Sequence, residues 1–199
     1  MQVITLNPHD FDANAERLAA YVREGSTIRY DAIVAVRRGG SFVCDAFCRH
    51  FPSDRYGKRY DVTLQRPSTK HKNGKLGNVL RRLPYFILDG MRMAEASLLV
   101  LRRRIMGAPE IPEVDIPDGL ADTLRQRSRP EILLIDDAID SGDTLFAIVE
   151  TLKNMNPDAR IDIAVMTETT SHPRIRANHT LYRNRTLIRF PWSSDYKNL

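Results

Sequence analysis

The sequence predicts an α/β fold, in which helices flank a mainly parallel, twisted β-sheet. Two observations point to it. The apolar runs 32–36 and 132–135 are too short for helices, and they lack the polar alternation of strands with one solvated face. Each run is followed by a turn of small and charged residues and then by apolar residues at helical spacing. Strands that alternate with helices in this way are typical of α/β folds.

Further elements are expected on both sides of these two units. A first helix should begin at Asn7 and Pro8, because Asn is a favoured N-cap and Pro suits the first helical position, and Gly25 should end it. Other strands are expected at 60–64, 161–165, 181–182 and 187–190. Other helices are expected at 43–50, 87–105, 120–124 and 144–155.

The composition is that of an ordinary soluble protein. A chain of 199 residues with 42% hydrophobic and 28% charged residues is expected to form a single domain, 1–199, with a full core. No apolar run is long enough to span a membrane, and residues 1–10 lack the pattern of a signal peptide. Cys44 and Cys48 are expected to be reduced core residues, so a cytoplasmic location is expected.

The net charge of +5 favours anionic ligands such as polyphosphates and does not exclude nucleic acid.

Two segments leave alternatives open. Residues 65–82 are polar and basic, and they form either a lid over a binding site or a disordered loop. The helix at 87–105 has a narrow apolar seam that packs on its own domain or on a partner. We therefore expect 66–128 to be a flexible loop plus a helical insertion, and 168–199 to form a small hood.

The stretch 132–145 carries the strongest functional signal. Its apolar strand ends in Asp136 and Asp137, which point to opposite faces and cannot both be buried without partners. The loop 140–144 leads into a helix, so free N–H groups and the positive end of the helix dipole meet at one place. Carboxylates beside such an anion site indicate sugar hydroxyls or Mg²⁺ next to a phosphate.

The turn after the first apolar run repeats this arrangement. Gly39 and Gly40 allow the backbone to approach a ligand closely. Arg37 and Arg38 can supply bidentate contacts to phosphate oxygens. A solvated basic turn is the alternative, but the second phosphate-type loop favours binding. Both loops follow strands, and ligands in such folds bind at the carboxyl ends of strands.

These residues carry a resemblance to a known family. Residues 132–145 resemble the phosphoribosyl pyrophosphate signature of the type I phosphoribosyltransferases, and 34–40 resemble the pyrophosphate loop of that family. The similarity extends toward the bacterial xanthine–guanine and hypoxanthine branch through three more segments: 4–22, 156–160 and 187–192. Residues 66–128 lie outside it.

The resemblance implies a transfer of the 5-phosphoribosyl group from phosphoribosyl pyrophosphate to a nitrogenous base, with Mg²⁺ as cofactor. The products are a nucleoside monophosphate and pyrophosphate, as in nucleotide salvage. Positive charge develops on the ribose and negative charge on the leaving pyrophosphate, which cations and N–H groups stabilise. Members of the family are usually homodimers, so the resemblance implies a homodimer here. No membrane partner is expected.

The resemblance also implies a role for each matching residue. Asp136 and Asp137 would take part in catalysis by binding the ribose hydroxyls or Mg²⁺, and Asp140 would act as general base and favour a purine. The residues expected to bind the 5′-phosphate are Ser141, Gly142, Asp143 and Thr144. Those expected at the pyrophosphate are Arg37, Arg38, Gly39 and Gly40, with a cis peptide bond between the two arginines. The base would contact Thr167, Leu187, Ile188 and Trp192, and a second Mg²⁺ would bind Asp195.

This sequence departs from the branch at three places. Thr167 and Glu168 stand where the branch has a lysine that reads a 6-oxo group, and a glutamate there would prefer an amino group. Leu187 stands where an aromatic side chain stacks on the base, so Trp192 is expected to substitute for it. Asp143 places a carboxylate in the phosphate loop. The base is therefore left open.

Two other functions stay as alternatives. One is a regulator that senses phosphoribosyl pyrophosphate and binds nucleic acid through basic surface, motivated by clusters at 70–82 and 102–104. No helix-turn-helix segment precedes the fold, so nucleic acid is the weaker expectation. The other is a partner-docking or dimerisation role for 83–128 on an ordinary enzyme.

Overall fold

The computed structural model describes residues 2–64, 84–85, 87–91, 93–94, 98, 113–183 and 185–197. Its strands are β1 (Gln2–Thr5), β2 (Tyr30–Val36), β3 (Tyr56–Leu64), β4 (Val114–Asp115), β5 (Glu131–Ile139), β6 (Arg160–Glu168), β7 (His179–Tyr182) and β8 (Thr186–Arg189). Its helices are α1 (Pro8–Gly25), α2 (Gly39–His50), a 3₁₀ turn (Ser53–Arg55), α5 (Asp118–Gln126) and α6 (Asp143–Met155).

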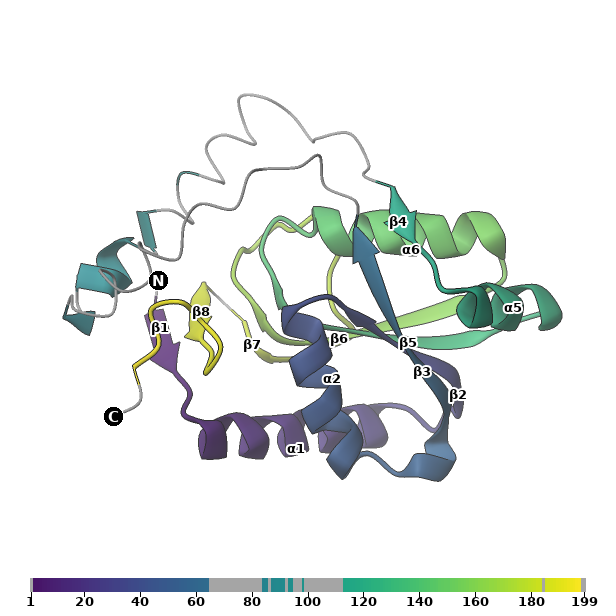
Figure 1. Cartoon of the computed structure of the whole chain (residues 1–199), viewed down its shortest axis with the longest axis horizontal. Coiled ribbons are helices and arrows are strands. Elements are labelled where there is room, and N and C mark those ends of the chain that lie inside the picture. Colours follow the sequence, from purple (N-terminus) through teal and green to yellow (C-terminus); the bar gives the residue numbers. More distant parts are fainter. Residues whose placement is uncertain are drawn as a thin grey trace.

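The strands form two sheets (Figure 1). The central sheet has the order β4-β3-β2-β5-β6-β7, and all neighbours in it are parallel except β4, which pairs antiparallel with β3. β1 and β8 pair in parallel as a separate two-stranded sheet. The predicted fold class, a mainly parallel sheet flanked by helices, is confirmed.

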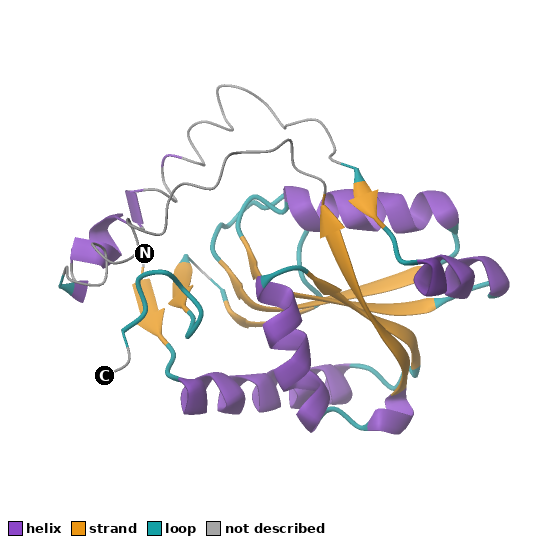
Figure 2. Cartoon of the chain, in the orientation of Figure 1, coloured by secondary structure: helices purple, strands orange, loops and turns teal. Residues whose placement is uncertain are grey.

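Helices cover both faces of the central sheet (Figure 2). Alternate residues of β2 point to opposite faces, so Ile33 packs in a core with α1 and α2, whereas Val34 packs in a second core with α5 and α6. Leu133 and Leu134 of β5 divide between the same two cores. This double burial explains why both strands are continuous apolar runs.

The predicted start of α1 is confirmed. The side chain of Asn7 accepts a hydrogen bond from the backbone N–H of Asp10 at 2.8 Å, and Pro8 is the first helical residue. Three strands differ most from the prediction. β3 begins at Tyr56 rather than residue 60, and β1 and the two-residue β4 were not expected. All three gain their backbone partners from segments distant in sequence.

Only part of the predicted insertion lies within the described residues. Of the expected helix 87–105, residues 87–91, 93–94 and 98 are helical. The predicted lid at 65–82, including its basic residues, lies outside the described residues, as do Arg102, Arg103 and Arg104. None of the helices in the described ranges is long and apolar enough to cross a membrane.

Candidate functional site

The two predicted anion-binding turns lie next to each other. β2 and β5 are neighbouring parallel strands, with Ala35 paired to Ile135, so both strands end at the same edge of the sheet. The turn after β2 leads directly into α2, and the loop after β5 leads into α6. The topology therefore brings residues 37–41 and 136–144 together at the carboxyl edge of the sheet, as predicted.

The two turns interlock through glycines. A Cβ atom added at Gly39 would lie 2.0 Å from Oδ2 of Asp137. One added at Gly40 would lie 2.7 Å from the carbonyl oxygen of Ile135 and 3.0 Å from Oδ1 of Asp136. The first turn of α2 thus packs directly against the end of β5, and no side chain fits between them.

The arginines of the first turn are available to a ligand. The peptide bond between Arg37 and Arg38 is cis, as the resemblance implied. The backbone is fixed because the N–H of Arg37 donates to the carbonyl of Val62 at 3.0 Å. Both arginines are exposed, and neither side chain makes a hydrogen bond or ion pair within the part of the chain that the structure describes.

The carboxylates at the end of β5 are desolvated. Asp136 is buried, and its Oδ1 accepts a hydrogen bond from the backbone N–H of Asp137 at 2.9 Å. Burial raises the pKa of Asp136 well above its usual range, and the adjacent Asp137 carboxylate raises it further. Burial and the nearby Asp140 also raise the pKa of Asp137. Unlike the prediction, both acids lie within the strand, because β5 continues to Ile139.

This donor set fits Mg²⁺. Within the described ranges no lysine or arginine forms an ion pair with Asp136 or Asp137, so their negative charge lacks a counter-ion there. Mg²⁺ is commonly held by one or two carboxylates together with substrate phosphate oxygens and water. The described residues contain no group of three or more His, Cys, Asp or Glu side chains that could hold a metal by themselves.

The loop between β5 and α6 has the geometry of an anion site. Gly142 has φ of +80°, and a Cβ there would meet the backbone nitrogens of Ile175 and Arg174 at 3.0 and 3.1 Å. The hydroxyl of Ser141 accepts a hydrogen bond from the N–H of Asp143 at 3.3 Å. The N-cap residue of α6 is Gly142, which has no side chain to accept a hydrogen bond from the first turn, so the positive end of the helix dipole is directed at the loop.

A residue that the sequence reasoning missed covers this loop. The N–H of Arg174, in the β6–β7 connection, donates to the carbonyl of Ser141 at 2.8 Å. Its guanidinium lies 3.6 Å from Oδ1 of Asp143 and 3.6 Å from the ring centroid of Phe146. Asp143, the acid in the predicted phosphate loop, was the one signal in the sequence for such a residue, because a buried or half-buried carboxylate needs a cation beside it.

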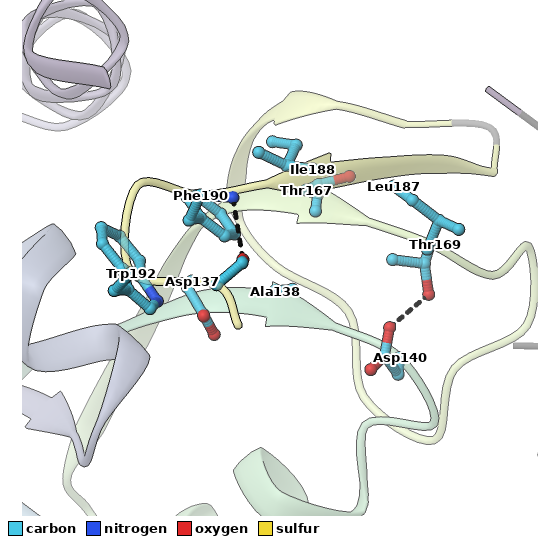
Figure 3. Close-up of a pocket in the computed structure, with 10 residues that line it drawn as sticks. Asp137, Ala138, Asp140, Thr167, Thr169, Leu187, Ile188, Phe190 and Trp192 are labelled. Carbon is cyan, nitrogen blue, oxygen red and sulfur yellow. Dashed lines mark hydrogen bonds between the residues drawn. The ribbon is translucent and has the colours of Figure 1, made fainter. Parts of the chain in front are cut away.

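A cavity of about 250 Å³ lies beside the carboxylates (Figure 3). Its wall comes from the end of β5, from β6 and the residue after it, and from the C-terminal segment: Asp137, Ala138, Asp140, Thr167, Thr169, Leu187, Ile188, Phe190, Trp192 and Ser193. The structure thus brings together all four residues predicted to contact the base. The sequence reasoning missed Ala138, Thr169, Phe190 and Ser193.

Trp192 belongs to an aromatic cluster at the cavity wall. Its ring stacks on Phe190 with centroids 4.6 Å apart and planes 7° apart. Phe42 of α2 lies 4.8 Å from it and Phe11 of α1 packs edge-on at 5.0 Å. The cluster joins α1, α2 and the C-terminal segment. Trp192 therefore serves as a packed wall of the cavity.

The structure corrects the expectation about Glu168. Successive residues of β6 point to opposite sides, so Thr167 lines the cavity and Glu168 does not. Oε1 of Glu168 accepts a hydrogen bond from the N–H of Ala177 at 2.8 Å, and Oε2 lies 3.4 Å from both Arg176 and Arg183. Its carboxylate is committed to these partners, so it does not select an amino group.

Asp195 also has a different partner from the predicted metal. Its Oδ2 accepts a hydrogen bond from Nε of Arg189 at 2.9 Å, and both side chains are buried. Arg189 also donates to Asp89 at 2.6 Å and Thr5 at 2.8 Å, and it lies over the ring of Tyr85. Arg189 already supplies a cation to the Asp195 carboxylate, and the second Mg²⁺ predicted at Asp195 stays a prediction.

No protein-family model and no curated protein sequence matches this chain. Solved structures do match. A purine phosphoribosyltransferase from Pyrococcus horikoshii Ot3 has a TM-score of 0.61 and 18% identity, covering 100% of this chain and 98% of that one. A xanthine-guanine-hypoxanthine phosphoribosyltransferase from Helicobacter pylori has a TM-score of 0.55 and 16% identity, with 96% and 90% covered. A hypothetical protein from Neisseria gonorrhoeae with bound ppGpp has a TM-score of 0.58 and 19% identity, with 96% and 89% covered.

These similarities establish the architecture. The chain has the type I phosphoribosyltransferase fold, and the resemblance read from the sequence is confirmed at the level of the fold. At these identities the comparisons carry no further conclusion about activity, which depends on the site itself.

Proposed function

We propose that the protein is a phosphoribosyltransferase that transfers the 5-phosphoribosyl group from phosphoribosyl pyrophosphate to a purine or purine-like base. One arrangement carries the proposal: two anion-binding turns meet at one sheet edge, with the desolvated pair Asp136 and Asp137 beside them. A ribose with a phosphate at one end and a pyrophosphate at the other requires two such anion sites, with hydroxyl acceptors between them.

The residues of the first turn would stabilise the leaving group. When the bond between C1′ and the pyrophosphate oxygen breaks, negative charge builds on the pyrophosphate. Arg37, Arg38 and the backbone N–H groups at the start of α2 would bind that charge. Asp136 and Asp137 would hold Mg²⁺ or the ribose hydroxyls, and the bound ion supplies positive charge to the leaving group.

Asp140 is the proposed general base. It lines the cavity, and the hydroxyl of Thr169 donates to its Oδ1 at 2.6 Å, which fixes the carboxylate (Figure 3). As the ring nitrogen of the base forms its bond to C1′, the proton on the base would pass to Asp140. The nucleoside monophosphate and pyrophosphate then leave, and the proton is lost to solvent.

The cavity wall restricts which base fits. Among its described residues, the charged side chains are carboxylates and none is a lysine or arginine. The hydroxyl of Thr167 donates to the carbonyl of Thr186 at 2.7 Å, so its proton is already used. A base that depends on a cationic partner for its 6-oxo group finds none on this part of the wall.

Pyrophosphate release tests the proposal. The full chain is incubated with Mg²⁺, labelled phosphoribosyl pyrophosphate and a panel of purines and pyrimidines. We expect release with at least one purine, and a loss of about 10²- to 10⁴-fold in Asp140→Asn, because that change removes the general base. Folded protein that releases no pyrophosphate with any base contradicts the proposal.

The proposal includes a homodimer and a cytoplasmic location, which the family resemblance implies. Sedimentation of the full chain tests the first, because a monomer at micromolar concentration would contradict it. Fractionation of the source cells tests the second.

A regulator that binds a phosphorylated ligand without turning it over is the second candidate. One observation favours it: the similar Neisseria gonorrhoeae structure contains ppGpp, a nucleotide with several phosphates. The basic stretches 70–82 and 102–104, which motivate nucleic-acid binding, lie outside the described residues. Tight ppGpp binding and a salt-dependent shift of DNA or RNA, without pyrophosphate release, would favour this candidate.

A further inference from the structure

The proposed phosphate loop contains an acid that opposes its ligand. Asp143 is the first residue of α6, where a carboxylate interacts favourably with the helix dipole. A phosphate bound at the same N-terminus would lie near this carboxylate and be repelled by it. The loop can therefore bind a phosphate well only if a nearby cation offsets the charge of Asp143.

Arg174 is placed to do this. Its backbone N–H donates to Ser141 at 2.8 Å, its guanidinium lies 3.6 Å from Asp143, and its Cζ lies 3.6 Å from the centroid of Phe146. These contacts fix both the backbone and the side chain of Arg174 against the loop and the first turn of α6. Gly142 makes this approach feasible, because a Cβ there would lie 3.1 Å from the nitrogen of Arg174.

The guanidinium keeps donors for a ligand. Arginine has five N–H donors, and the 3.6 Å separation from Asp143 is longer than a hydrogen bond. Within the described chain, the side chain of Arg174 makes no other ion pair and no hydrogen bond. Its side chain is 27% exposed, so solvent and a ligand can reach it.

Two neighbouring arginines differ in this respect. Arg176 and Arg183 both pair with the buried carboxylate of Glu168 at 3.4 Å. They neutralise a structural acid away from the cavity, whereas Arg174 faces α6. Arg174 therefore differs from these two arginines, and its proposed binding role does not follow from the positive charge of the segment alone.

We propose that Arg174 is a phosphate-binding residue, whose guanidinium binds the phosphomonoester held at the N-terminus of α6 and offsets the charge of Asp143. The inference rests on the proposed function, because the ligand class is a sugar 5′-phosphate. It assigns to this site a cation from the β6–β7 connection.

Binding of ribose 5-phosphate to the full chain, measured by calorimetry, tests the inference without requiring turnover. We expect Arg174→Gln to weaken binding about 10- to 100-fold, the range for hydrogen bonds to a charged group. Asp143→Asn should bind at least as tightly as the wild type. The double variant should bind more tightly than Arg174→Gln alone, because it loses the direct contact but also the repulsion. Arg176→Gln is the matched control and should stay within about twofold of wild type, since exposed charges contribute little at a distance.

Several results would overturn the inference: no binding of ribose 5-phosphate by the wild type, wild-type affinity in Arg174→Gln, or equal losses in Arg174→Gln and Arg176→Gln. If Arg174→Gln fails to fold, Arg174→Lys serves instead, because it keeps the charge and loses the planar fork. Wild-type affinity in Arg174→Lys, together with no gain in affinity from Asp143→Asn, also contradicts the inference. Arg174-dependent binding without pyrophosphate release for any base leaves the inference standing while the proposed transferase activity fails. Pyrophosphate release that does not depend on Arg174 leaves the proposed transferase activity standing, while the inference about Arg174 fails.

Discussion

The buried guanidinium of Arg189 donates from Nε to Oδ2 of Asp195 at 2.9 Å, and only 1% of the arginine is exposed. The same guanidinium also donates to Asp89 and Thr5. One side chain therefore joins the C-terminal segment to β1 and to the insertion. Leu187 and Ile188 on β8, just before Arg189, line the cavity, so this node supports one of its walls.

Asp195→Asn should destabilise the protein by about 3 kcal/mol, because removing one partner of a buried ion pair leaves an uncompensated charge. The remaining contact with Asp89 keeps the loss at the lower end of the expected range. The Mg²⁺ requirement of the proposed reaction should not change. Urea unfolding and a Mg²⁺ titration measure the two effects.

Asp122→Asn is the matched control for that experiment. It removes the same kind of carboxylate from an exposed pair with Arg125 on α5, where both side chains are more than half exposed. The expected loss is below about 1 kcal/mol. A raised Mg²⁺ requirement in Asp195→Asn, with unchanged stability, would instead support the metal role predicted from the sequence.

Gly39→Ala and Gly40→Ala should fail in different ways. At Gly39 the new methyl group meets the side chain of Asp137, which can rotate away, so the fold should survive while the carboxylate is displaced and activity is lost. At Gly40 it meets the backbone of Ile135 in the central strand, which cannot move alone, so we expect a loss of about 1–3 kcal/mol. Thermal unfolding and pyrophosphate release separate the two. Equal stability of the two variants would contradict this reading of the turn.

Asp136→Asn should remove a pH dependence of stability. Burial raises the pKa of Asp136, so the folded state binds its proton more tightly than the unfolded state, whose carboxyl titrates near 3.8. Stability should therefore fall as pH rises from about 3.8 through the raised pKa. The Asn variant should be more stable than the ligand-free wild type above that window and equal to it below, although it loses activity.

The pH series is measured by urea unfolding with and without Mg²⁺. Added Mg²⁺ should stabilise the wild type most at the alkaline end, where both carboxylates are ionised, and should stabilise Asp136→Asn less. A variant whose stability follows the wild-type curve at every pH would show that the buried carboxylate is not the titrating group.

Glu168→Gln should cost little, since a glutamine oxygen can still accept from the N–H of Ala177 and the two arginine partners are about half exposed. Glu168→Ala should cost about 2 kcal/mol, because it leaves a buried N–H unsatisfied. Neither change should alter which base is preferred, since Glu168 does not line the cavity. The base panel and urea unfolding test this. A switch in base preference in either variant would show that Glu168 contacts the base after all.

Much of the fold could be predicted because its signals are local. Apolar runs identified β2 and β5, and Asn7 with Pro8 identified the start of α1, since a helix cap involves residues only a few positions apart. Turn composition placed both anion loops after their strands. The end of β5 was missed because its polar residues stay in the ladder with β6, where Ala138 pairs with Thr167.

The sequence by itself determined the class of fold, the positions of the two turns predicted to bind phosphate and the acids beside them, because residues adjacent in the chain encode each of these. Only the tertiary structure decided which distant side chains meet. A single step along β6 puts Thr167 at the cavity and turns Glu168 away, and long-range packing brings Arg174 to Asp143 and Arg189 to Asp195. Such contacts depend on strand register and on loop paths between remote segments, which no local pattern specifies.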